Sequence, residues 1–267
     1  MPMEIPYKLN EIDHRYGPRT HVLNDPFATT LLAELCSPRT FQPRINQLVE
    51  LLYHNLLQAV ANCEFEQSYV ETETRMSEFH KEAIYKGHVF SPNQRVITVS
   101  VARAGLLPSQ ICYDRMNQLL NPQCVRQDHL LVSRVTDEKS QVQGSQIAGS
   151  KIGGDIEECL VLIPDPMGAT GGTIRKIIEH YDKEIKGKAK KYIALNLIVT
   201  PEYLKQVLSI NDSVEVYAFR VDRGLSSAKV LDSIPGTYWD QEKGLNSKQY
   251  IVPGGGGFGE IMNNSFV

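Results

Sequence analysis

Apolar runs of strand length alternate with helix-like segments through most of the chain, and this alternation limits the possible folds more than any other feature. Buried strands are indicated at residues 95–101, 129–135, 160–164, 191–200 and 214–222. Helical patterns lie between them at 106–120, 173–181 and 201–210. Strands and helices that alternate in units of this length form βαβ connections. We therefore expect an α/β fold with a mostly parallel central sheet, flanked by helices on both faces.

Two further helices are expected before the first of these strands. The segment "NDPFATTLLAEL" offers Asn24 or Asp25 as an N-cap and has Pro26 in its first turn, which is typical of a helix start. Apolar residues then recur every three or four positions, as in one face of an amphipathic helix. They are Ile45, Leu48, Val49, Leu52, Leu56 and Val60.

The length of the chain limits its domain organisation, and its net charge limits the classes of partner that it can bind. With 267 residues the chain can bury a full core, and we expect an N-terminal arm at 1–20 followed by one domain at 21–267. Residues 136–158 are polar and rich in Gly and Ser, which predicts a mobile hairpin. The net charge of −3 indicates neither a nucleic-acid-coating nor a membrane-surface protein. An anionic ligand should instead meet a local positive site.

The five cysteines stand singly, with no CxxC pair and no metal-type Cys/His spacing. We expect them to be reduced thiols, and we expect no resident metal site. No apolar run approaches the ~20 residues of a transmembrane helix, and the N-terminal segment has no apolar signal region. These features predict a soluble cytoplasmic protein.

The stretch "CLVLIPDPMGATGGTIRKIIEHY", residues 159–181, carries the strongest chemical signal. Ligands of open α/β sheets bind beyond the carboxyl ends of the strands, where residues 165–173 lie. Their small residues allow backbone N–H groups to approach an anion, Thr170 and Thr173 add hydroxyl donors, and the following helix adds its N-terminal dipole. This segment is predicted to hold a phosphate.

A glycine-rich turn without a ligand is the alternative. The loop lacks the lysine of a Walker loop, and GATGG is not GxGxxG. Asp165 argues against an empty turn, because a carboxylate at a strand end beside a phosphate loop needs a partner such as a sugar hydroxyl or Mg²⁺.

The wording "VLIPDPMGATGGT" closely resembles the phosphoribosyl-diphosphate loop of type I phosphoribosyltransferases, and DPMxATGG resembles uracil phosphoribosyltransferases in particular. The resemblance covers most of the chain. "HVLNDPFATTLLAEL" is similar to the family's N-terminal segment, "VARAGL" to its diphosphate loop, "LVSRVTDE" to the entry of its flexible hairpin, and "GLNSKQYIVPG" to its base-binding signature.

The resemblance implies a role for each matching residue. Arg103 and Asp165 would be the catalytic residues, and Arg103 and Arg134 would contact the diphosphate. Arg103 follows a strand and precedes a Gly turn, where its guanidinium fork can bind two diphosphate oxygens. The 5-phosphate and the ribose would be held by Asp165, Pro166, Met167, Gly168, Ala169, Thr170, Gly171, Gly172 and Thr173. The base would lie against Ile251, Gly256, Gly257 and Phe258.

The base-binding signature departs from the family's YIVPGLGDAGDR, because this chain reads "YIVPGGGGFGEIMNN". Gly257 replaces the family's first aspartate, Phe258 its alanine, Glu260 its second aspartate and Ile261 its arginine. Phe258 either fills the base pocket or turns outward, and Glu260 is a partial substitute for the lost charge. We expect weakened uracil transfer, which Gly257→Asp together with Phe258→Ala would restore.

A second departure is an insertion at 223–243, in which Tyr238 and Trp239 are expected to pack against the body of the domain. The alternative is that these aromatic residues form an altered ligand or subunit surface.

The resemblance implies transfer of phosphoribose from phosphoribosyl diphosphate to a pyrimidine base, converting uracil to UMP in pyrimidine salvage. Mg²⁺ would arrive with the substrate, and a homo-oligomer, dimer or tetramer, would be formed. The alternative is a weak or inactive homologue that senses a nucleotide or phosphoribosyl diphosphate, or an enzyme for another base.

Overall fold

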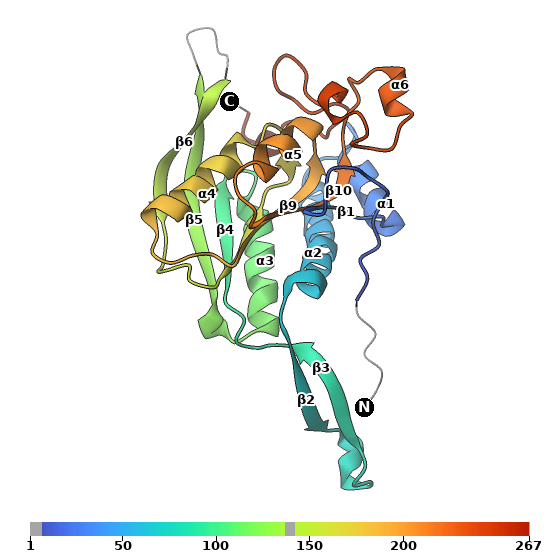
Figure 1. Ribbon diagram of the computed structural model, residues 1–267, viewed down its shortest axis with the longest axis vertical. Helices are drawn as coiled ribbons and strands as arrows, with labels where there is room; N and C mark the ends of the chain where they lie inside the picture. Colours follow the sequence, from blue (N-terminus) through green and yellow to red (C-terminus); the bar gives the residue numbers. More distant parts are fainter. Residues whose placement is uncertain (1–6, 137–141, 267) are drawn as a thin grey trace.

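A mostly parallel sheet forms the centre of the molecule (Figure 1). The computed structural model describes residues 7–136 and 142–266, without the side chains of 133–136 and 142–145. Within those residues the central sheet has eight strands in the order β1-β10-β9-β7-β4-β5-β6, with β8 paired to β9. All pairs are parallel except β5 with β6. The strands are β1 (Thr20–Val22), β4 (Val96–Ala102), β5 (Val125–Thr136), β6 (Val142–Lys151), β7 (Leu160–Pro164), β8 (Met167–Gly168), β9 (Lys191–Val199) and β10 (Val214–Val221).

Helices cover both faces of this sheet, as predicted. The helices are α1 (Pro26–Leu35), α2 (Arg44–Glu64), α3 (Leu106–Leu119), α4 (Gly172–Glu184), α5 (Pro201–Leu208), α6 (Ala228–Leu231) and α7 (Phe258–Ile261). Alternate residues of β7 face opposite layers: Leu160 and Leu162 pack with α1, α2 and α3, whereas Val161 and Ile163 pack with α4 and α5. The continuous apolar runs in the sequence therefore reflect burial on both faces.

The two early helices form where their sequence predicts helices. Asp25 caps α1, because its side chain accepts a hydrogen bond of 3.0 Å from the N–H of Ala28. The helix α2 extends the predicted segment at both ends, and its buried residues include all six of the predicted apolar positions.

Besides the two-residue strand β8, two regions of β structure were not predicted. The edge strand β1 is too short to give a periodic signal. A two-stranded arm, β2 (Gln67–Glu73) and β3 (Ile84–Phe90), projects from the body of the molecule with the 3₁₀ turn η1 (Arg75–Glu78) at its tip (Figure 1). The arm exposes apolar side chains on a surface that contributes little to the core. They are Tyr69, Met76, Phe79, Ile84, Tyr85 and Val89.

The hairpin predicted at 136–158 overlaps the antiparallel pair of β5 and β6. Residues 137–141 of that range lie outside the described part of the chain.

The segment 223–243 packs against the body, and Trp239 provides the contact. Its Nε1 donates a hydrogen bond of 2.9 Å to the Pro201 carbonyl, and its ring meets that of Tyr16 edge to face at 5.1 Å. The buried carboxylate of Glu242 joins the same region, because it accepts from the Tyr16 hydroxyl at 2.7 Å and pairs with Arg223 at 2.9 Å. The chain is thereby fixed just before it enters the base-binding signature.

All five cysteines are free thiols, as expected. Among the helices that the structure describes, none combines the length and apolarity needed to cross a membrane.

Candidate functional site

The carboxyl ends of β4, β7, β9 and β10 meet at one edge of the sheet because these strands are parallel neighbours. The turns after β4 and β7 touch: a side chain at Gly105 would lie 2.8 Å from the Pro164 carbonyl oxygen. Arg103 and Asp165 therefore stand at the same end of the sheet, as the strand order predicts.

The phosphate loop, residues 165–173, is fastened to β9 along its first half. The N–H of Asp165 donates to the Leu195 carbonyl at 3.0 Å, and Asn196 Nδ2 donates to the Asp165 carbonyl at 2.7 Å. Met167 and Gly168 then form β8 beside β9. Directly after β9, Thr200 Oγ1 donates to the Ala169 carbonyl at 2.6 Å.

Two buried tyrosines hold the part of β9 to which the loop is fastened. The Tyr53 hydroxyl donates to the Leu195 carbonyl at 3.0 Å, and the Tyr203 hydroxyl donates to Asn196 Oδ1 at 2.9 Å. Burial, and then the charge of Asp165, raise the pKa of both hydroxyls well above its usual value. Both remain protonated donors at neutral pH, so the loop rests on a fixed hydrogen-bond network.

Packing accounts for two of the loop's glycines. A side chain at Gly168 would meet Val199 at 2.9 Å and the Tyr203 ring at 3.1 Å. Gly171 has a φ of +80°, and a side chain there would lie 3.0 Å from Gln206 and Val207 of α5. These two glycines therefore allow the loop to press against β9 and α5, whether or not a ligand is bound.

The second half of the loop presents hydrogen-bond donors. Among the described residues, the N–H groups of Thr170 and Gly171 have no backbone acceptor, and the N–H of Gly172 makes only a long contact of 3.4 Å with Thr170 Oγ1. The first turn of α4 adds the N–H groups of Thr173 and Ile174, which have no intrahelical acceptor. These donors, with the N-terminal dipole of a 13-residue helix, suit an anion.

Arg103 lies between the end of β4 and the C-terminal segment. Its Nη1 donates to the Ser265 carbonyl at 3.1 Å and to Ser265 Oγ at 2.9 Å, and its Nη2 lies 3.6 Å from Glu260 Oε1. The sequence did not predict this contact with the chain's end. The side chain of Arg134 falls outside the described residues, so its expected contact with diphosphate stays a prediction.

The base segment, residues 251–258, closes the same edge of the sheet. Ile251 forms an isolated bridge with Leu245 and packs partly buried against the core, and Gly256 has a φ of +88°. Phe258 is only 2% exposed and belongs to the core cluster beneath α1 and α2. Its ring does not turn outward: a side chain at Gly255 would lie 2.8 Å from it.

The burial of Phe258 changes the expected effect of Gly257→Asp together with Phe258→Ala on the stability of the protein. Phe258→Ala would leave a cavity in the core and cost about 3–5 kcal/mol of stability. An aspartate at Gly257 would meet the carboxylate of Glu260, which already fills that space. The combined variant is therefore expected to unfold more easily, while its effect on turnover stays a prediction.

A cavity of about 440 Å³ adjoins the base segment. Gly254, Gly255 and Gly256 form one wall, and Cys36 and Phe41, from the connection between α1 and α2, line another. Burial raises the pKa of the Cys36 thiol, so this wall is neutral.

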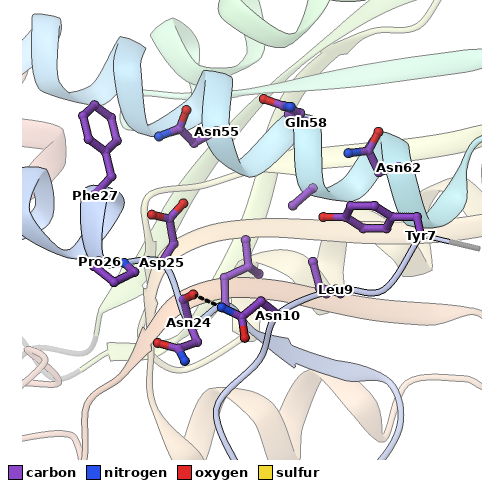
Figure 2. A pocket seen from close by; sticks show the side chains of 12 residues that line it. Tyr7, Leu9, Asn10, Asn24, Asp25, Pro26, Phe27, Asn55, Gln58 and Asn62 are labelled. Carbon is purple, nitrogen blue, oxygen red and sulfur yellow. Dashed lines mark hydrogen bonds between the residues drawn. The ribbon is translucent and has the colours of Figure 1, made fainter.

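A second cavity, of about 520 Å³, opens beside α2, where Asn55, Gln58 and Asn62 line it together with Tyr7 and Asn24 (Figure 2). Its described lining contains no residue of the phosphate loop or the base segment and no Lys or Arg. It therefore offers no positive charge to a phosphate.

In addition to the residues that hold the phosphate loop, sequence reasoning missed three residues that hold the base segment and the chain leading to it. The buried carboxylate of Asp222 accepts from Arg220 Nε at 2.6 Å and from the Gly254 N–H at 2.7 Å, and Glu202 accepts from the Gly244 N–H at 3.0 Å. Burial disfavours the charge of Arg220, but Asp222 raises its pKa. The available signal was a pair of opposite charges two residues apart at the carboxyl end of an apolar strand.

Within the described residues, no three His, Cys, Asp or Glu side chains gather in a way that could hold a metal ion.

Comparison with known proteins identifies related sequences. A family model described as uracil phosphoribosyltransferase matches residues 22–237. A uracil phosphoribosyltransferase of Dictyostelium discoideum is 27% identical over 178 residues, which is 66% of this chain and 67% of that protein. Uracil phosphoribosyltransferase 1 of Schizosaccharomyces pombe is 30% identical over 181 residues, 67% of each chain. With the Campylobacter concisus enzyme, 34% identity extends over 43% of this chain and 45% of that protein.

A solved structure has the same fold. The AQ2163 protein from Aquifex aeolicus superposes with a TM-score of 0.68 at 20% sequence identity, covering 91% of this chain and 97% of that chain.

We predict that Asp222→Asn will lower the free energy of unfolding by about 1.5–3 kcal/mol, because it weakens charge-assisted hydrogen bonds to Arg220 and the Gly254 N–H. Urea unfolding measures the loss. Asp240→Asn is the matched control, since the Asp240 side chain is 98% exposed and should change stability by less than ~0.5 kcal/mol. Equal effects of the two substitutions would show that Asp222 does not hold the base segment.

Proposed function

Because this chain belongs to the uracil phosphoribosyltransferase family, we propose that it transfers the phosphoribosyl group of phosphoribosyl diphosphate to uracil, forming UMP in pyrimidine salvage. The observation that carries the proposal is the row of N–H donors from Thr170 to Ile174 at the same sheet edge as Arg103. A phosphate and a diphosphate on one substrate require two such anion sites side by side.

Each part of the edge has a proposed role. The phosphate loop binds the 5-phosphate, Asp165 accepts from ribose hydroxyls, and Arg103, with Arg134, binds the diphosphate that arrives with Mg²⁺. The ribose C1–oxygen bond breaks as a ring nitrogen of uracil bonds to C1. Diphosphate leaves with the bonding electron pair, and the nitrogen's proton passes to solvent. Positioning and charge stabilisation supply most of the rate enhancement.

The base segment favours a second candidate function. With glycine at 257 and a core phenyl ring at 258, the segment lacks a carboxylate that the family's signature carries. A weak homologue that senses phosphoribosyl diphosphate or a nucleotide, or that acts on another base, would retain the phosphate loop and lose uracil turnover.

We predict that the protein converts radiolabelled uracil to UMP when Mg²⁺ and phosphoribosyl diphosphate are supplied. Product formation is measured by chromatography, with cytosine, hypoxanthine and adenine as alternative acceptors. Binding of phosphoribosyl diphosphate without UMP formation would reject uracil transfer and support sensing or another base.

We predict that Thr173→Val will weaken binding of phosphoribosyl diphosphate roughly tenfold, or ~1.4 kcal/mol, because a hydroxyl donor to a charged oxygen is lost. Isothermal titration calorimetry measures the affinity. Thr29→Val, in the first turns of α1 and exposed, makes the same chemical change away from the site and should have no effect. Gly171 is unsuitable for this test, since its positive φ would strain any side chain.

Free thiols suit a reducing compartment, and we propose that the protein acts in the cytoplasm.

We also propose that the protein forms a homo-oligomer, with the arm formed by β2 and β3 as the contact surface, because the apolar side chains of the arm lie outside the core.

We predict that light scattering will give at least twice the mass of one 30.0 kDa chain. Tyr85 and Val89 lie on one face of β3, and Tyr85→Asp with Val89→Asp should reduce the mass to that of the monomer. Leu225→Asp changes an exposed leucine of the 223–243 segment and should leave the mass unaltered. A monomeric wild type would reject self-association, and an oligomer unaffected by the arm substitutions would exclude the arm.

A further inference from the structure

The carboxylate of Glu260 occupies the space in which a side chain at Gly257 would begin. A Cβ atom built on Gly257 would overlap Glu260 Oε2. Gly257 is the N-cap of α7, and Glu260 lies three residues along, at a position from which a glutamate side chain reaches back to the N-cap. The short helix α7 thus places the carboxylate of Glu260 in the space beside Gly257, where glycine has no side chain.

The same carboxylate faces the arginine after β4. Glu260 Oε1 lies 3.6 Å from Arg103 Nη2, and the two side chains are 31% and 35% exposed. A pair that is partly shielded from water is screened less by salt than a fully exposed one. Glu260 therefore restricts where the Arg103 guanidinium can lie.

The contacts of Arg103 leave it able to bind a ligand. A guanidinium has five N–H donors. The two bonds to Ser265 and the pair with Glu260 engage at most three of them. At least two donors, including that of Nε, have no partner among the described residues, and two donors are enough for a bidentate contact with diphosphate.

We propose that Glu260 supplies, from three residues further along the chain, the carboxylate that the base segment lacks at Gly257, and that it positions Arg103 for the diphosphate. This inference rests on the proposed function. It assigns Glu260 the role of a positioning residue that acts through Arg103. The carboxylate that stands in place of the family's second aspartate thereby also covers the position of the first, and the glycine at 257 provides the space that the longer side chain needs.

Calorimetric titration with Mg²⁺-phosphoribosyl diphosphate and, separately, with UMP tests the proposal. Both ligands carry a 5-phosphate and a ribose, but only the first carries a diphosphate. Glu260→Gln keeps the size of the side chain and removes its charge. We expect it to weaken phosphoribosyl diphosphate binding by about tenfold and to change UMP affinity by less than about twofold.

The rescue experiment uses position 257. We expect Gly257→Asp alone to weaken phosphoribosyl diphosphate binding, because two carboxylates would compete for one space. In a Glu260→Ala background the same Gly257→Asp change should recover most of the affinity that Glu260→Ala removes. Because asparagine caps a helix as aspartate does but carries no charge, Gly257→Asn in the same background should cap α7 without recovering the affinity.

Glu34→Gln is the matched control. Glu34 pairs with Arg44 at 2.7 Å on the surface, with both side chains 44% exposed, and neither residue belongs to the site. The Glu34→Gln variant should bind phosphoribosyl diphosphate and UMP with the same affinities as the wild type. Thermal unfolding of every variant separates loss of binding from loss of folding.

Two results would overturn the inference while the proposed function stands. If Glu260→Gln binds phosphoribosyl diphosphate as tightly as the wild type, Glu260 does not position Arg103. If it binds more tightly, the pair is an inhibitory contact. A folded wild type that binds neither ligand would instead reject the proposed function, and the inference with it.

Discussion

The site depends on the parallel pairing of β4, β7, β9 and β10, which brings four carboxyl ends to one edge of the sheet. Helices cover both faces of these strands, because their alternate residues pack into opposite cores. The edge is therefore the place where the turns after the strands can meet a ligand. Arg103, Asp165 and Asp222 all lie at this edge although they are far apart in the sequence.

Buried polar side chains hold these turns in position. Tyr53 and Tyr203 fix the backbone and Asn196 of β9, to which the phosphate loop is fastened, and Asp222 with Arg220 fixes the base segment. Each of these groups makes at least one hydrogen bond within the protein, so the network adds rigidity to the edge. Rigid donors lose little freedom when an anion binds, which favours both affinity and catalysis.

The diverged end of the chain has a physical interpretation. Phe258 extends the core beneath α1 and α2, and Gly257 leaves room for the Glu260 carboxylate beside Arg103. The model of the uracil phosphoribosyltransferase family matches residues 22–237, and this match ends before the base segment. The signature positions at which this chain differs, Gly257 and Phe258 among them, therefore lie outside the matched residues.

The sequence by itself determined the α/β class, the five principal strands, the helices between them and the position of the phosphate loop, because periodicity and small residues at strand ends are local signals. The arm of β2 and β3 has no buried face, so its pattern did not distinguish it from a polar connection. Only the tertiary structure decided that Phe258 turns into the core, that Ser265 reaches Arg103 and that Glu260 fills the space of a missing side chain. Such contacts join residues distant in the chain or depend on how a single turn folds back, and hydrophobic pattern specifies neither.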